Sequence, residues 1–68
     1  MTQTEMILRY LQENGSITAA DAVSEIGCYR LGARIHDLKA AGYDIKRETV
    51  TKRNRFGHPV SFASYSLQ

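Results

Sequence analysis

The sequence predicts a small α+β domain in which three helices are followed by a two-stranded antiparallel β-hairpin. Three observations lead to this fold class. Apolar residues recur at helical spacing in three segments of residues 1–42, and each segment ends at a glycine. After Gly42 the pattern changes to alternation, and β-branched and aromatic residues become frequent. The chain has 68 residues, so we expect residues 1–68 to form a single domain with a compact core.

The first predicted helix covers about residues 3–13. Thr2 and Glu5 have the spacing of a capping box, in which each side chain bonds the other's backbone. Asn14-Gly15 ends the helix, because both residues tolerate the left-handed conformation that a helix end needs. Its amphipathic stripe consists of Met6, Ile7, Tyr10 and Leu11.

The second predicted helix is short and covers about residues 19–26. Residues 16–18 precede it as a connector that can make a single strand-like pairing. Thr18 takes the N-cap position and Asp21 places an acid in the first turn, where it suits the helix dipole. Gly27 ends the helix. Its small apolar face consists of Ala19, Ala22, Val23 and Ile26.

The third predicted helix, about residues 29–41, has two different sides. Ile35 and Leu38 fall within about 40° of Leu31 on a helical wheel, so this side packs on the core. The other side is small in its middle, whereas a solvated helix face more often carries Lys and Glu. That outer side carries Tyr29, Arg30, Ala33, His36, Asp37 and Ala40. We therefore predict that this helix lies in a nucleic-acid groove.

The hairpin is predicted from two strand-like runs, residues 43–50 and 60–67, that are separated by an exposed loop, residues 51–59. The residues expected on its inward face are Ile45, Ala63, Tyr65 and Leu67. Phe56, within the loop, either anchors the loop to the domain or stays exposed.

Positive charge is concentrated in the hairpin. The chain has a formal net charge of +2. Residues 1–42 hold four basic and five acidic side chains, giving −1, whereas residues 43–68 hold five basic and two acidic ones, giving +3. Such asymmetry indicates a polyanionic partner, and the alternative is a solvated, flexible loop. The basic residues that cluster in the predicted loop are Lys52, Arg53 and Arg55.

Two helices joined by a tight glycine turn form a helix-turn-helix, and with a following hairpin the order is that of a winged helix-turn-helix. The run from Arg30 to Leu38 reads Arg-Leu-Gly-Ala-Arg-Ile-His-Asp-Leu, and Ala41-Gly42-Tyr43-Asp44-Ile45 follows. It resembles the small helix-turn-helix domain proteins of bacteriophages and prophages, in which Arg-Leu-x-Ala-Arg-Ile-x-Asp-Leu precedes a helix-ending glycine. The resemblance covers nearly the whole chain and implies DNA binding by the third helix and the wing. Gly32 departs from the family's usual small polar residue.

Candidate DNA contacts lie on the third helix and the wing. Arg30 projects outward and can reach a guanine edge or a phosphate. Arg34 lies nearer the core, and its structural alternative is an ion pair with Asp37. The hydroxyl of Tyr29 can reach a phosphate, or its ring can lie on the preceding turn. The full set of predicted contacts is Tyr29, Arg30, Ala33, Arg34, Lys52, Arg53 and Arg55.

Catalytic and metal-binding motifs are absent from the sequence. No Cys/His cluster has metal-ligand spacing, and no glycine-rich phosphate loop occurs. Neither His36 nor His58 stands in a recognisable catalytic arrangement. Cys28 is single, so no internal disulfide can form, and we expect it to be buried. We therefore expect no enzymatic activity, no cofactor and no metal. With no apolar run of membrane-spanning length and no signal peptide, we also expect a cytoplasmic protein without a membrane partner.

The predicted function is binding of double-stranded DNA, as a phage or prophage transcriptional regulator or an excision-type architectural factor. A single module of this size has an interface of only about 600–1,000 Å². Useful affinity therefore calls for a homodimer, tandem sites or a helper protein. The alternative is a winged-helix protein-interaction module, such as a phage-encoded inhibitor of a host protein complex. Binding of structured RNA is a third hypothesis.

Overall fold

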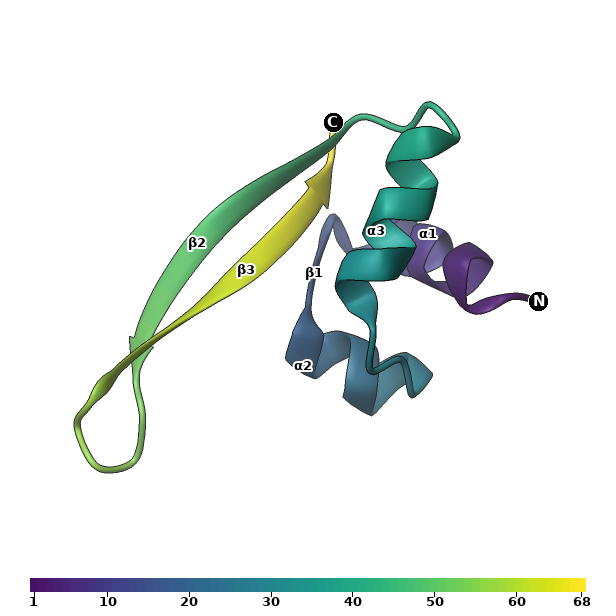
Figure 1. Ribbon diagram of the computed structural model, residues 1–68. Coiled ribbons are helices and arrows are strands. Elements are labelled where there is room, and N and C mark those ends of the chain that lie inside the picture. The colour runs from purple at the N-terminus through teal and green to yellow at the C-terminus, as the bar shows by residue number, and fades with distance from the viewer.

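The computed structural model describes residues 1–68 and shows helices gathered on one side, with a long hairpin projecting away from them (Figure 1). The predicted fold class, three helices followed by an antiparallel hairpin, is confirmed. In chain order the elements are α1 (Gln3–Asn14), β1 (Ser16–Thr18), α2 (Ala19–Asp21), the π-helical η1 (Ala22–Ile26), α3 (Leu31–Ala40), β2 (Ile45–Arg53) and β3 (Pro59–Leu67).

Both predicted ends of α1 are confirmed. The Thr2 hydroxyl accepts the Glu5 N–H at 3.1 Å, and the Glu5 carboxylate accepts the Thr2 N–H at 3.1 Å. The pKa of the Glu5 carboxyl is lowered mainly by the hydrogen bond from the Thr2 backbone and next by the hydrogen bond from the Thr2 hydroxyl. Both bonds favour the ionised form. At the other end Gly15 has φ 87° and donates to the Leu11 carbonyl at 2.8 Å.

The connector before the second helix is a strand, so the sheet has three strands and not two. The strand order is β1-β3-β2, with both pairings antiparallel. Ile17 lies opposite Tyr65 and is fully buried. The predicted strand-like pairing is therefore confirmed, and it ties the base of the hairpin to the helices.

The second helix has its predicted bounds but changes its winding. Thr18 and Asp21 form a second capping box, with bonds of 3.2 and 3.0 Å. From Ala22 to Ile26 the helix is a π-helix, and it ends at Gly27, which has φ 77°.

The apolar face predicted for this helix is only half correct. Ala22 is fully buried and Ile26 packs against the core, but Ala19 and Val23 are exposed. The prediction assumed α-helical spacing throughout. Ala19 lies in α2, before the π-helical residues, whereas Val23 lies among them, where the wider winding leaves Ala22 and Ile26 on the core side.

Helix α3 begins at Leu31, two residues later than predicted, and Tyr29 and Arg30 lie in the connection before it. Arg30 has φ −125° and ψ 56°, outside the helical region. The burial of Cys28 explains why α3 begins later than predicted. It is 1% exposed, as expected for a buried cysteine, and its N–H donates to the Ala22 carbonyl at 2.9 Å. The chain is therefore anchored in the core before the helix begins. The predicted core stripe is confirmed, with Leu31, Ile35 and Leu38 buried.

The first strand of the hairpin begins at Ile45, not at residue 43. Tyr43 belongs instead to the turn that ends α3, because its N–H donates to the Leu38 carbonyl at 3.1 Å. Gly42, with φ 102°, takes the left-handed position in this turn.

The far end of the hairpin is more regular than predicted. Arg53 pairs with Pro59, so the loop shrinks from residues 51–59 to residues 54–58. Thr51 is a strand residue, and its hydroxyl lies 2.9 Å from that of Ser61. This part of the hairpin lies beyond the core and is exposed on both faces. No apolar alternation marks it in the sequence, which is why its composition predicted a loop.

A single cluster of buried residues joins the three helices to the base of the hairpin. Tyr65 and Leu67 pack against it as predicted, whereas Ala63 is half-buried and lies outside it. The buried members are Ile7, Leu11, Ile17, Ala22, Cys28, Leu31, Ile35, Leu38 and Ile45.

The substitution Gly32→Ala is expected to stabilise the domain. Gly32 is exposed in the first turn of α3, and a Cβ there would have nothing within 4 Å. Alanine has the higher helix propensity, so the gain is up to about 1 kcal/mol. In a domain of this size that corresponds to about 4–8 °C in Tm by thermal denaturation. Gly27→Ala is the matched control and is expected to lower Tm, because Gly27 has φ 77°. Equal shifts would contradict this explanation.

Candidate nucleic-acid interface

The exposed surface at the start of α3 carries two of the predicted contact residues. Tyr29 is 82% exposed, so its ring does not lie buried against the preceding turn. Arg30 is also exposed, and its side chain forms neither a hydrogen bond nor an ion pair. Both lie directly before the N-terminal end of α3, the end that helix-turn-helix proteins direct at base edges. This end therefore presents a free guanidinium group and a phenol to a partner.

Arg34 forms the ion pair with Asp37 that was the structural alternative for this residue. Its Nε donates to Asp37 Oδ2 at 3.1 Å, and its side chain is only 30% exposed. The same carboxylate oxygen accepts the hydroxyl of Thr4 at 3.4 Å. Since Thr4 lies on α1, the three side chains link α3 to α1. Arg34 thus holds the orientation of α3, and Ala33 beside it is half-buried.

Two exposed side chains on α3 extend this surface and were not predicted as contacts. His36 and Lys39 are exposed, and with the exposed Gly32 they follow the i, i+4, i+7 spacing of one helix face. His36 appeared on the predicted outer side, but nothing distinguished it as a contact. Lys39 lies about 80° from Leu31 on the wheel and therefore looked like a flank of the core stripe. The i, i+4, i+7 spacing of Gly32, His36 and Lys39 is the sequence pattern that could have identified this exposed face.

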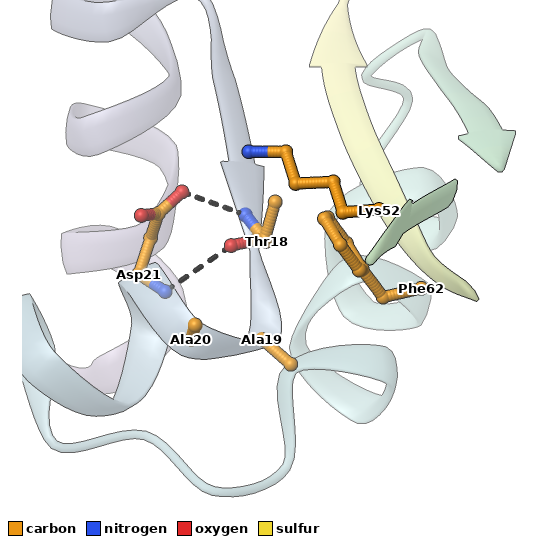
Figure 2. Close-up of a pocket in the computed structure, with 6 residues that line it drawn as sticks. All are labelled: Thr18, Ala19, Ala20, Asp21, Lys52 and Phe62. Carbon is orange, nitrogen blue, oxygen red and sulfur yellow. Dashed lines mark hydrogen bonds between the residues drawn. The ribbon is translucent and has the colours of Figure 1, made fainter. Parts of the chain in front are cut away.

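Lys52 lies within strand β2 and not in the loop. Figure 2 shows its side chain reaching across a pocket between the hairpin and the start of α2. The pocket has a volume of about 490 Å³. Its lining is largely apolar and includes the ring of Phe62. The lining residues are Thr18, Ala19, Ala20, Asp21, Lys52 and Phe62. Lys52 therefore faces the helices, while the other two wing residues lie at the tip.

Hydrogen bonds shape the loop at the tip of the hairpin. Arg53 Nη1 donates to the Gly57 carbonyl at 2.7 Å. Asn54 Oδ1 accepts the N–H groups of Phe56, at 2.9 Å, and of His58, at 3.1 Å. These bonds give the loop a defined conformation, although all of its residues are exposed.

Arg55 and Phe56 project from this loop as a pair. The Arg55 guanidinium carbon lies 5.2 Å from the centre of the Phe56 ring, within the range of a cation–π interaction. Phe56 is 74% exposed. It therefore does not anchor the loop to the domain, which decides between the two alternatives for this residue.

Positive charge at the far end of the hairpin is not paired with acidic side chains. Lys46 pairs with Glu48 at 3.1 Å near the base. Glu48 is the last acidic residue of the chain. None of the three basic residues beyond it forms an ion pair, although Asp21 lines the same pocket as Lys52, and this excess of positive charge favours contact with a polyanion. They are Lys52, Arg53 and Arg55.

The structure contains no group of three or more metal-ligating side chains. Every buried side-chain nitrogen and oxygen has a hydrogen-bond partner. None of the helices has the length and apolar character that crossing a membrane requires.

A short helix, a glycine turn, a longer helix with one exposed face and a basic hairpin together define a winged helix-turn-helix domain. The chain matches the family described as winged helix-turn-helix domain over residues 2–68, and it belongs to this family. Such domains are typically DNA-binding modules without enzymatic activity. No curated protein and no solved structure gives a significant match.

Proposed function

We propose that this protein binds double-stranded DNA, with the exposed face of α3 in the major groove and the hairpin on the neighbouring backbone. The observation that carries the proposal is the unpaired positive charge beyond Glu48, on a domain that also has an unpaired arginine directly before α3. Membership of the winged helix-turn-helix family supports the same conclusion.

The residues of α3 have different roles in this proposal. Arg30 is the reader of base edges, because a free guanidinium group can bond guanine O6 and N7 together. Tyr29 contacts a phosphate or a thymine methyl beside it. Ala33 permits close approach of the helix to the groove. Arg34, which is paired with Asp37, positions the helix and directs its remaining N–H groups to the phosphates of the DNA backbone.

The wing contacts phosphates and therefore contributes affinity more than specificity. Lys52 faces the pocket between the hairpin and α2, and it binds a DNA phosphate at the opening of this pocket. Arg53 and Arg55 lie at the tip and bind further along the duplex.

For the biological role we propose a transcriptional regulator or an excision-type architectural factor of a phage or prophage, acting in the cytoplasm of the bacterial host. The run from Arg30 to Ile45, which resembles phage and prophage proteins, supports this assignment. One module has an interface of only about 600–1,000 Å². The proposal therefore includes a homodimer, adjacent sites or a helper protein on the DNA.

A protein-interaction module is the second candidate function, with a host protein complex as the partner. Two exposed aromatic side chains favour it, Tyr29 at 82% and Phe56 at 74% exposure. Exposed aromatic residues are enriched in protein–protein interfaces. Under this alternative the chain would be captured by a host protein from a nuclease-treated lysate and would show no affinity for duplex DNA.

The substitution Arg30→Ala tests the role assigned to α3. Loss of a bidentate base contact is expected to weaken binding by about 1–3 kcal/mol, or roughly 5- to 150-fold, and to relax specificity at one position. The measurement is fluorescence anisotropy with duplexes selected from a random pool. Arg9→Ala is the matched control, because it removes the same charge from an exposed arginine on α1 that pairs with Glu13. Equal losses in the two variants would contradict the role of Arg30.

A further inference from the structure

Phe56 stands at the far end of the hairpin, and no other part of the domain covers it. Its side chain is 74% exposed, although an aromatic ring gains much from burial. The loop holds it outward: Asn54 Oδ1 accepts the Phe56 N–H at 2.9 Å, and the Gly57 N–H donates to the Asn54 carbonyl at 3.0 Å. The ring is therefore presented from a hydrogen-bonded turn.

The surroundings of this ring are positively charged. The Arg55 guanidinium group lies over it at 5.2 Å, and Arg53 is bonded to the Gly57 carbonyl directly behind the tip. No acidic residue follows Glu48 in the chain. A narrow minor groove has an enhanced negative potential and attracts inserted arginine side chains. An arginine beside an exposed apolar ring is thus suited to this groove.

We propose that Arg55 and Phe56 form a wedge that enters the minor groove, where Phe56 inserts at a base step, partly unstacks it and kinks the duplex. Apolar wedges on architectural proteins bend DNA in this way. The inference rests on the proposed binding of duplex DNA and adds a mode of recognition to it. The wedge favours pyrimidine–purine steps such as TA, because these are the most easily unstacked.

The length of the hairpin allows this contact. Strand β2 has nine residues, which span about 30 Å at roughly 3.3 Å per residue. Ile45, at its base, is its only buried residue, and Figure 1 shows the tip projecting far from the helices. Adjacent major and minor grooves are about half a helical turn, or roughly 17 Å, apart. The tip therefore reaches the minor groove next to the major groove that α3 occupies.

The sequence contains no tryptophan, so Phe56→Trp places a single indole at the tip. This variant is titrated with a short duplex of alternating TA steps at low salt, while anisotropy of the labelled duplex reports binding independently. We expect the indole emission to be quenched by stacking on the bases and to become protected from acrylamide. Tyr43→Trp is the control, because Tyr43 lies in the turn after α3, at the base of the hairpin. Its emission is expected to stay unchanged.

Bending is measured by energy transfer between the two ends of the same duplex. The unsubstituted chain is expected to bring the ends closer, and Phe56→Leu to retain most of the effect, because leucine is also an apolar wedge. Phe56→Ala is expected to lose the bend and about tenfold in affinity. Its thermal unfolding is expected to be unchanged, because the ring makes no contact with the core.

The outcomes separate the wedge from the function on which it rests. Normal binding with unquenched indole emission, or equal bending by the unsubstituted chain and Phe56→Ala, overturns the wedge and leaves DNA binding intact. No binding of the duplex at low salt overturns both. A blue shift of the indole emission on anionic vesicles, without quenching on DNA, also overturns the wedge and assigns the tip to a membrane surface.

Discussion

Replacing Lys52, Arg53 and Arg55 together with alanine is expected to remove most of the salt dependence of DNA binding. Each phosphate contact contributes about 0.9 to the slope of log affinity against log salt, so the slope should fall by roughly 3 units. None of the three side chains forms an ion pair, and no acidic residue follows Glu48 in the chain. The measurement is duplex affinity between about 50 and 200 mM salt.

Single substitutions divide this effect among the residues of the wing. Each of the three alanine variants is expected to reduce the slope by about one unit. Lys46→Ala is the control on the same hairpin, because Lys46 already pairs with Glu48. A slope that the triple variant leaves unchanged would show that the wing does not contact the backbone.

The second large effect concerns the core, where Leu11→Ala is expected to destabilise the domain by about 2–5 kcal/mol. Leu11 is 1% exposed and lies on α1, away from the proposed DNA surface. A domain with so few buried residues has little stability to lose. Thermal or urea denaturation should show a Tm lower by about 10 °C or more.

The control for the core prediction is Val23→Ala, which removes an apolar side chain that is 37% exposed. It is expected to change stability by no more than about 0.5 kcal/mol. Comparable losses from the two substitutions would mean that Leu11 does not pack in the core as the structure shows.

Local signals predicted the helices of this domain well. The capping box at Thr2, the N-cap at Thr18 and the glycine ends at Gly15 and Gly27 depend on residues three or four apart. Such contacts can be read from spacing alone. The core stripe of α3 is equally local, because its three members lie on one side of a helix.

The errors in the predicted fold arise where burial in the core or pairing between strands decides the bounds of an element. The start of α3 depends on Cys28, which is anchored to Ala22 in the core. The length of the hairpin depends on pairing such as Arg53 with Pro59, in strands exposed on both faces. Composition cannot reveal this pairing, because neither strand carries an apolar pattern there.

The residue types of the candidate site could be predicted from the sequence, but most of the contacts that position them could not. The free side chain of Arg30 and the basic cluster of the hairpin follow from residue types and their spacing. The Arg34–Asp37 pair follows from spacing, but the bond from Thr4 to Asp37 joins residues 33 positions apart, beyond the reach of any local pattern. The exposure of Phe56 likewise follows from hydrogen bonds within the loop, which composition does not show.

The proposed DNA binding is tested by titrating the unsubstituted chain with random-sequence duplex DNA across a salt series. We expect binding at low salt with an affinity that falls by at least about 3 log units per log unit of salt, and a weaker interaction with an RNA duplex of matched sequence. An absence of binding at low salt, an affinity independent of salt, or a preference for the RNA duplex would contradict it.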